Sequence, residues 1–198
     1  MIMGLTGGIA SGKSTVSALL QRRGARLVDA DVIAREVMLP GHPVLAAVVE
    51  HFGRDLLLPD GSLNRAALGE RVFGNPEALH TLNGLTHPAI RAEIREQMQR
   101  LDSEQPSGLV IVDIPLLYES GLETMFKSVL VVYVPRAVQL ERLMARNGLT
   151  REQAVKRLDA QMDIEQKRLR ADYVIDNSGS PEAAEEQVGL LWDRLGLS

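Results

Sequence analysis

The chain has 198 residues, of which 45% are hydrophobic and 24% are charged, and its formal net charge is −4. It can bury one α/β core, and no stretch reaches the ~18 consecutive apolar residues of a membrane-spanning helix. The absence of cysteine excludes disulfides, thiolate catalysis and cysteine-ligated zinc, and the four histidines show no metal-ligand spacing. We therefore expect a cytoplasmic protein without membrane or nucleic-acid partners, and the composition leaves its oligomeric state open.

A glycine-rich loop follows the first apolar run of the chain. Residues 7–14, with the sequence Gly-Gly-Ile-Ala-Ser-Gly-Lys-Ser, match the pattern G-x-x-x-x-G-K-[ST]. We predict a buried strand before this loop and a helix after it. Gly7 and Gly12 would allow a tight turn in which successive N–H groups point at an anion, and the helix would add its positive end. Lys13 is then expected to reach the β- and γ-phosphates of a nucleotide, and the Ser14 hydroxyl to bind Mg²⁺.

Five apolar runs predict a parallel sheet. Their hydrophobicity is continuous rather than alternating, which is typical of strands covered by helices on both faces. Ligands bind at the carboxyl ends of the strands in such a sheet, so we expect the chemistry to follow each run. The predicted strands are residues 1–6, 25–29, 109–114, 129–134 and 173–176. The polar residues at or just beyond the ends of four of them are Ser14, Asp31, Asp113 and Asp176.

Two helical insertions interrupt the alternation of strands and helices. The first, residues 36–106, carries apolar residues at three- and four-residue spacing, and we expect it to hold a phosphate acceptor. In the second, residues 145–171, one helix ends at Asn147-Gly148 and a capping-box pattern starts another at Thr150. We predict that this second insertion is an exposed basic lid. The helices of the first insertion are predicted over residues 44–52, 64–73, 78–85 and 88–101, and the basic residues of the lid are Lys156, Arg157, Lys167, Arg168 and Arg170.

Four residues have both a functional and a structural interpretation. Asp113 closes an apolar run and is either part of a Mg²⁺ site or a cap at the end of a strand. Arg142 and Arg146 share a helix face, where they either neutralise a transferring phosphoryl group or form a solvated surface pair. His87 precedes Pro88, so it either contacts a ligand or occupies the position before a helix that starts with proline.

Two carboxylates and an arginine follow the second predicted strand. Asp29 and Asp31 lie at its end, and Arg35 comes four residues later. A hydroxyl acceptor needs a carboxylate to orient it and accept its proton, and an acceptor with its own phosphate needs an arginine nearby. The competing interpretation is that Asp31 caps the next helix and forms an ion pair with Arg35.

Five segments of the sequence, spread over nearly its whole length and in the same order, match one enzyme family. They are residues 6–15, Asp29-Ala30-Asp31 with Ile33-Ala34-Arg35, His87-Pro88, Pro115-Leu116-Leu117 with Glu119, and residues 171–177. With these segments the chain resembles the bacterial dephospho-CoA kinases. The resemblance implies transfer of the ATP γ-phosphate to the ribose 3′-hydroxyl of dephospho-CoA, the last step of CoA synthesis, with Mg²⁺.

The resemblance also implies an architecture, a P-loop kinase core of α/β class with an inserted helical acceptor region and a helical lid. We predict a single domain over residues 1–198, with its core at about 1–35, 107–144 and 172–198, the acceptor insertion at about 36–106 and the lid at about 145–171. The inserted helices would cover dephospho-CoA and the lid would close over ATP.

The predicted site has four groups of residues. The catalytic group is Asp31, Lys13 and Arg142, in which Asp31 acts on the acceptor hydroxyl. The ATP-binding group is Ala10, Ser11, Gly12, Lys13, Ser14, Thr15, Arg146 and Asn177. The acceptor-binding group is Asp31, Arg35 and His87, and the Mg²⁺ group is Ser14 and Asp113.

Two other functions remain open at this point. A nucleoside monophosphate or small-metabolite kinase would share the core, the lid and the mechanism, and the Asp29-Ala30-Asp31 segment argues against it. A nucleotide-dependent switch of the GTPase type is the second alternative, but none of the four lysines has the [NT]-K-x-D context that reads guanine. Release of ADP that depends on an acceptor would distinguish a kinase from a switch.

Overall fold

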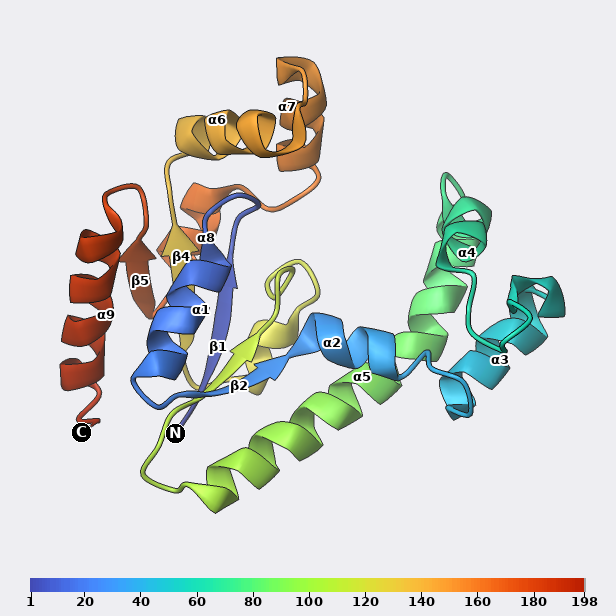
Figure 1. Ribbon diagram of the computed structural model, residues 1–198, viewed down its shortest axis with the longest axis horizontal. Coiled ribbons are helices and arrows are strands. Elements are labelled where there is room, and N and C mark those ends of the chain that lie inside the picture. Colours follow the sequence, from blue (N-terminus) through green and yellow to red (C-terminus); the bar gives the residue numbers. More distant parts are fainter. Residues whose placement is uncertain (198) are drawn as a thin grey trace. The chain divides into compact units, whose positions relative to one another are not determined.

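The computed structural model describes residues 1–197, which Figure 1 shows as a ribbon. These residues divide into two compact units. The first unit contains Met1–Val28 and the chain from Met98 onward, and the second contains Asp29–Gln97. The second unit holds most of the predicted acceptor insertion, and the prediction of a single domain with that insertion stays a prediction.

The first unit is built on a five-stranded parallel sheet, as predicted. The strand order is β2-β3-β1-β4-β5, so β1, which precedes the glycine-rich loop, lies in the centre. Leu5 of β1 pairs with Asp113 of β3 on one side and with Leu130 of β4 on the other. The strands lie within one or two residues of their predicted bounds: β1 Ile2–Gly7, β2 Arg26–Asp29, β3 Val110–Asp113, β4 Val129–Tyr133 and β5 Tyr173–Asp176.

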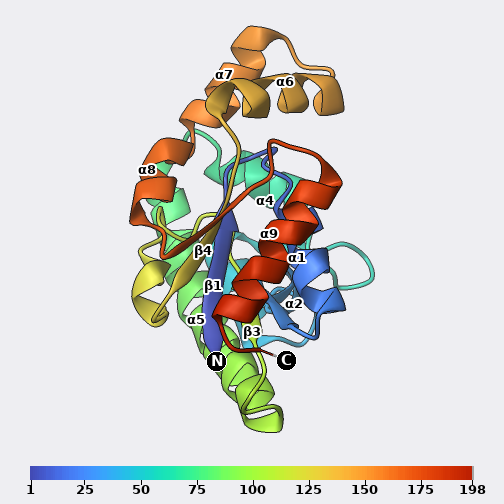
Figure 2. The same ribbon diagram turned by 90° about the vertical axis from the view of Figure 1, so that its left-hand side faces the viewer.

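Helices cover both faces of this sheet, which explains why its strands are continuously apolar. Helices α1 (Lys13–Arg22) and α9 (Pro181–Arg194) contact each other on one face, and α8 (Ile164–Arg170) packs against β4 on the opposite face (Figure 2). The core between the sheet, α1 and α9 includes Met3, Leu20, Ile111, Leu130 and Trp192. Helices α6 (Arg136–Asn147) and α7 (Arg151–Asp159) pack against each other, and a short 3₁₀ helix, η2, spans Leu122–Met125.

The predicted start and end signals of the lid helices are confirmed, but the lid differs from its prediction in two respects. Gly148 ends α6 in the left-handed region with φ 60°, and the Thr150 capping box starts α7. The segment after Thr150 forms two helices, because α7 ends at Asp159 and α8 begins at Ile164. Lys167 is not exposed: it is completely buried, since the face of α8 that packs on the sheet contains Ile164 and, one turn later, Lys167. The other four predicted basic residues of the lid are exposed.

The second unit is helical, and polar side chains define the starts of its helices. Asp29, His42 and Asn64 accept hydrogen bonds from the first-turn N–H groups of α2 (Ala30–Glu36), α3 (Pro43–Phe52) and α4 (Arg65–Val72). The last two helices therefore lie close to their predicted ranges. The unit also contains the 3₁₀ helix η1 (Arg54–Leu56) and the start of α5 (Pro76–Glu104).

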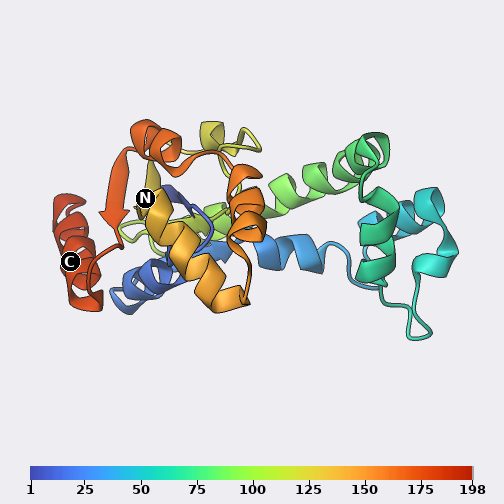
Figure 3. The ribbon, with the colours of Figure 1, turned by 90° about the horizontal axis from the view of Figure 1, so that it is seen from above.

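Helix α5 passes through Pro88 without ending, so the two helices predicted around His87-Pro88 are one. Proline removes one backbone hydrogen bond of the helix and crowds the carbonyl group four positions earlier, which belongs to Gly84. The 29-residue helix retains its other hydrogen bonds, and Figure 3 shows it as a long green coil. The interpretation of His87 as the residue before a helix start is therefore wrong, because His87 lies inside the helix.

Candidate active site

The glycine-rich loop combines two left-handed residues with three glycines at which a Cβ would approach a neighbour closely. At Gly8 a Cβ would lie 2.1 Å from Nε2 of Gln139. Gly12 has φ 77°, and a Cβ there would lie 2.2 Å from Nδ2 of Asn177. Ala10 has φ 60°, which costs an L-residue about 1–2 kcal/mol. Gly7 has no positive φ, in contrast to the tight turn predicted there; a Cβ at Gly7 would lie 2.9 Å from the carbonyl oxygen of Val132. A side chain at Gly7 would therefore collide with its neighbours, and a side chain at Gly12 would also be strained by the left-handed backbone conformation.

The loop lines a pocket of about 280 Å³. Its walls are the loop residues 7–14 together with Pro115, Arg146 and Gln161. Helix α1 begins at Lys13, and its unpaired N–H groups and macrodipole make this end of the pocket favourable for an anion. The backbone around the pocket is therefore suited to bind phosphate.

Lys13 and Asp113 form an ion pair at the carboxyl ends of β1 and β3. Both side chains are largely buried, with 20% of Lys13 and 11% of Asp113 exposed. The predicted phosphate ligand and the predicted Mg²⁺ ligand therefore lie side by side, and Ser14 follows directly in the chain. The pair keeps an ammonium and a carboxylate at the edge of the sheet where a ligand is expected.

Three further predicted residues of the ATP group and the lid surround the loop. Nδ2 of Asn177 donates a hydrogen bond to the backbone oxygen of Ser11 at 2.9 Å. Arg142 donates from Nη2 to the backbone oxygen of Asn177, also at 2.9 Å, so the surface-pair interpretation does not describe it. Arg146 is exposed, lines the pocket and donates to the side chain of Asn147.

Two glutamines that the sequence analysis did not identify hold the same loop. The Ile9 N–H donates to Oε1 of Gln161 at 2.9 Å, and Nε2 of Gln139 donates to the Ile9 carbonyl oxygen at 2.9 Å. Gln139 was detectable in principle, because it lies one turn before Leu143 on the buried stripe of α6. Gln161 lies between two helices and has no comparable signal.

The second unit holds the predicted acceptor residues. Asp29 accepts hydrogen bonds from the N–H groups of Asp31 and Val32 at 2.8 and 3.1 Å, so Asp29 is the N-cap of α2. Asp31 is therefore not the cap, and its side chain is exposed in the first helical turn. Nε of Arg35 donates to the backbone oxygen of Asp31 at 3.2 Å, in place of the ion pair considered above.

His87 is half-buried in α5, in the part of this helix that belongs to the second unit. Burial lowers the pKa of His87 below 6.5, and the charge of Arg91, one turn later, lowers it further. The imidazole is thus favoured in its neutral form, which can both donate and accept a hydrogen bond.

These features define a P-loop α/β protein of the phosphotransferase type. A central strand leads into a phosphate-binding loop, and a lysine and a strand-end aspartate adjoin it. Side chains from α6, from the linker between α7 and α8 and from Asn177 after β5 contact the loop. No helix formed by residues 1–197 is both long and apolar enough to cross a membrane.

Known proteins identify the family. The family model for dephospho-CoA kinase matches residues 1–182. The dephospho-CoA kinases of Carboxydothermus hydrogenoformans and Anaeromyxobacter dehalogenans are 51% and 52% identical, over 94% and 92% of this chain and 90% and 86% of their own lengths. The chain therefore belongs to the dephospho-CoA kinase family. It catalyses the ATP-dependent phosphorylation of dephospho-CoA, the final step of CoA biosynthesis.

Solved structures agree with this assignment. The structure of dephospho-CoA kinase from Campylobacter jejuni superposes with a TM-score of 0.77 at 36% identity and covers 98% of this chain and 96% of its own. Shikimate kinase from Bacteroides thetaiotaomicron, at 16% identity and a TM-score of 0.51, shares the fold alone. Membership of the family removes the small-metabolite kinase and the GTPase-type switch as alternatives.

Proposed function

We propose that the glycine-rich loop binds the ATP phosphates, that Asp31 activates the acceptor hydroxyl, and that Ser14 and Asp113 hold Mg²⁺. The observation that supports the first assignment most strongly is the pocket lined by residues 7–14 at the positive end of α1. We assign phosphate contacts to Ala10, Ser11, Gly12, Lys13, Ser14 and Thr15. Asn177 supports the loop from its hydrogen bond to the Ser11 carbonyl oxygen.

Charge on the transferring phosphoryl group requires positive side chains. In our proposal Lys13 leaves Asp113 when ATP binds and contacts the β- and γ-phosphates. Arg146 lines the pocket, and Arg142 lies next to the loop through Asn177. Phosphoryl transfer has a loose transition state with charge on the peripheral oxygens, so these cations act mainly by electrostatic stabilisation.

The residues proposed for Mg²⁺ are chemically suited to it. Mg²⁺ prefers oxygen ligands and is commonly bound in kinases by one or two protein groups together with substrate phosphates and water. The Ser14 hydroxyl and the Asp113 carboxylate are such oxygen donors, and Asp113 lies beside Lys13 at the loop. When bound, the ion would neutralise charge on the β- and γ-phosphates.

The acceptor residues proposed are Asp31, Arg35 and His87. Because Asp29 caps α2, the exposed Asp31 carboxylate is not needed for that task and can orient the ribose 3′-hydroxyl and accept its proton. Arg35 is exposed one turn later and can bind a phosphate oxygen of dephospho-CoA. The neutral imidazole of His87 can form a hydrogen bond with the same substrate.

Coupled ADP release tests these assignments. With ATP and Mg²⁺, dephospho-CoA should stimulate ADP release far more than AMP, adenosine or shikimate, and an analogue without the 3′-hydroxyl should give no stimulation. The variants Ser14→Ala and Asp113→Asn should need more Mg²⁺ for half-maximal rate. Stimulation by the 3′-deoxy analogue would contradict the assigned acceptor atom, and an unchanged Mg²⁺ requirement would contradict the assigned metal ligands.

Location and partners are also proposed. The two substrates, ATP and dephospho-CoA, are small molecules of intracellular metabolism, so we propose that the enzyme works in the cytoplasm. Cell fractionation followed by the same ADP-release assay measures this directly. Activity that sediments with the membrane fraction would contradict it.

A further inference from the structure

Lys167 is the charged side chain that the structure buries most completely among the residues described. None of its surface is accessible to solvent. Transfer of an ammonium group from water into a protein interior is strongly unfavourable unless the charge is paired and its hydrogen bonds are satisfied. A leucine or methionine would fill the same space beneath α8 without that cost. The charge of Lys167 therefore requires an explanation beyond packing.

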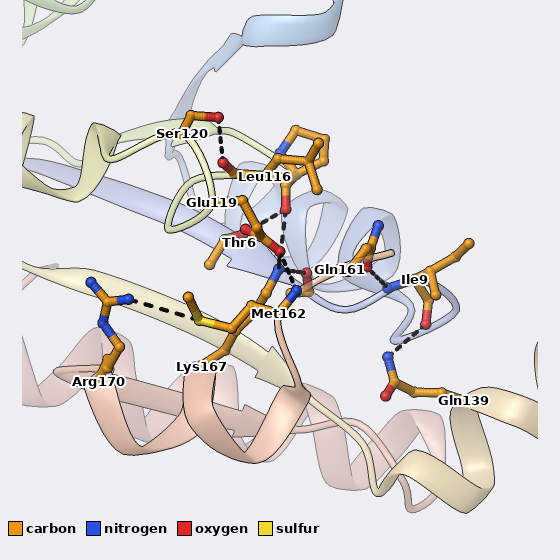
Figure 4. A network of polar contacts seen from close by, with 12 residues as sticks. Thr6, Ile9, Leu116, Glu119, Ser120, Gln139, Gln161, Met162, Lys167 and Arg170 are labelled. Atoms are coloured by element: carbon orange, nitrogen blue, oxygen red, sulfur yellow. Dashed lines mark hydrogen bonds and ion pairs between the residues drawn. The ribbon is translucent and has the colours of Figure 1, made fainter. Parts of the chain in front are cut away.

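Three acceptors surround Nζ of Lys167, one for each of its protons. They are Oε1 of Glu119 at 2.8 Å, the backbone oxygen of Gly7 at 3.1 Å and the backbone oxygen of Pro115 at 3.4 Å (Figure 4). Gly7 is the last residue of β1 and the first residue of the phosphate-binding loop, and Pro115 follows β3 shortly after Asp113. The ammonium thus joins the exit of β1, which leads through the loop to Lys13, to the exit of β3, which ends at Asp113.

Glu119 extends this contact to the segment between α7 and α8. The same Oε1 atom accepts a hydrogen bond from the Met162 N–H at 2.9 Å. The preceding residue, Gln161, accepts the hydrogen bond of the Ile9 N–H. The ion pair therefore fixes the linker that carries Gln161 against the loop, and Figure 4 shows these side chains gathered around the start of the loop.

The consequence for the loop is that its first three residues cannot reorient independently. The Gly7 carbonyl is bound to Lys167, and the Ile9 peptide is held on both sides by Gln161 and Gln139. The N–H groups available to a phosphate are those that follow, and their direction depends on how the start of the loop is held. Electrostatic stabilisation of a transferring phosphoryl group requires donors that are already oriented.

We infer that Lys167 is a positioning residue for phosphoryl transfer: paired with Glu119, it fixes the start of the phosphate-binding loop and the Gln161 linker so that the loop is preorganised for ATP. Lys167 does not touch the substrate in this role. It acts on ATP through the Gly7 carbonyl and the linker. The inference rests on the proposed assignment of residues 10–15 to the ATP phosphates.

The test compares Lys167→Met with the double variant Lys167→Met/Glu119→Gln in the full chain. Lys167→Met leaves the Glu119 carboxylate, whose side chain is 20% exposed, without its ammonium partner, so the Tm should fall. The double variant removes both charges and keeps an amide oxygen for the Met162 N–H, so its Tm should recover most of that loss. Steady-state ADP release then gives kcat, the KM for ATP and the KM for dephospho-CoA for both variants.

We expect the KM for ATP to rise and kcat to fall, each by at least about tenfold, in both variants, because the loop has lost its preorganisation in both. The KM for dephospho-CoA should stay within about twofold. The matched control is Arg168→Met on the same helix, which removes a half-exposed cation paired with Glu165 and should leave all three constants unchanged. Wild-type enzyme without acceptor-dependent ADP release would instead refute the proposed function.

A purely structural role for Lys167 predicts a different result. In that case the double variant, with its Tm restored, would show the wild-type KM for ATP and the wild-type kcat. That result overturns the inference, as does a double variant that fails to fold, since Lys167 would then be essential to folding itself.

Discussion

Asp29 and Asp31 are two neighbouring carboxylates of which Asp29 caps a helix and Asp31 does not. Asp29 lies at the end of β2 and binds the first-turn N–H groups of α2, where an N-cap side chain contributes about 0.5–2 kcal/mol. Asp31 is one of the exposed residues of that first turn. From the sequence alone, Asp31 could be either the cap of this helix or the base. The hydrogen bonds that Asp29 accepts show that Asp29 is the cap.

The first prediction uses this pair of residues. Asp31→Asn should lower kcat at least tenfold, within the 10²- to 10⁴-fold scale of general-base catalysis, and leave Tm close to wild type because the cap is intact. Asp29→Ala should lower stability by about 1 kcal/mol. ADP-release kinetics and thermal unfolding of both variants provide the measurement. An Asp31→Asn protein that melts much lower but turns over normally would show that Asp31 has a structural role.

The second prediction concerns Lys13. Lys13→Met should lower kcat on the order of 10²-fold or more, because a preorganised cation at the phosphates is lost. It should also lower stability by about 1.5–3 kcal/mol, because a hydrogen bond between two charged and largely buried side chains, Lys13 and Asp113, is lost. Lys127→Met, at an exposed position, is the matched control. Unchanged turnover in folded Lys13→Met would refute the assignment of the phosphate-binding loop.

At the scale of elements, helix α6 carries core residues and residues that lie at the loop or its pocket on adjacent stripes. Leu143 is fully buried, and Gln139 one turn earlier reaches the Ile9 carbonyl oxygen. Arg142 and Arg146 lie four residues apart on the neighbouring stripe of α6. Arg142 contacts the backbone oxygen of Asn177, and Arg146 lines the pocket. A single helix therefore both supports the loop and directs positive charge toward it.

The third prediction tests whether Arg142 and Arg146 act as individual side chains rather than through the overall positive charge of the lid. Arg142→Met and Arg146→Met should each lower kcat about tenfold or more and change the KM for dephospho-CoA by less than about twofold, since their charge acts on the transferring phosphoryl group. Arg157→Met, on the exposed surface of α7, should behave like wild type. If both variants raised only the acceptor KM, the two arginines would belong to the acceptor site.

Helix α8 illustrates a limit of reading elements from their composition. The basic composition of this segment predicts that Lys167 is exposed, whereas Lys167 is 0% exposed and Leu169, two residues later, is 74% exposed. The prediction fails because the ammonium finds three acceptors on the exits of β1 and β3, and the positions of those oxygen atoms depend on tertiary packing. The lid was predicted as an element, but the orientation of its second helix was not.

At the scale of the whole molecule, the sheet was predictable and several connections were not. All five strands follow from apolar runs, because a strand buried on both faces leaves a strong and local signal. The break predicted at Pro88 was wrong, because the loss of one backbone hydrogen bond at this proline does not end the 29-residue helix. Motifs identified the loop residues, but Gln139 and Gln161 bind that loop from 130 and 152 residues away, which no local pattern records.

The fourth prediction concerns the pH dependence of unfolding. The pKa of His87 is lowered in the folded protein from 6.5, first by burial and second by Arg91. Between the folded pKa and 6.5 the unfolded chain therefore binds the proton more tightly, so stability should fall as the pH falls through this window. Tm measured from about pH 7.5 downward should decrease less steeply for His87→Gln than for wild type. His80→Gln, at an exposed position of the same helix, should keep the wild-type slope; an equal slope in all three proteins would contradict the prediction.

The hydrogen bonds that hold the phosphate-binding loop come from residues far along the chain, so during synthesis the loop acquires them late. The loop is made before its supports at Gln139, Gln161, Lys167 and Asn177, which follow it by up to 166 residues. At ribosomal rates of about 5–20 residues per second, the loop waits on the order of ten seconds for them. If this loop binds ATP as we propose, the nucleotide can therefore stabilise the supported loop only after residue 177 has been made.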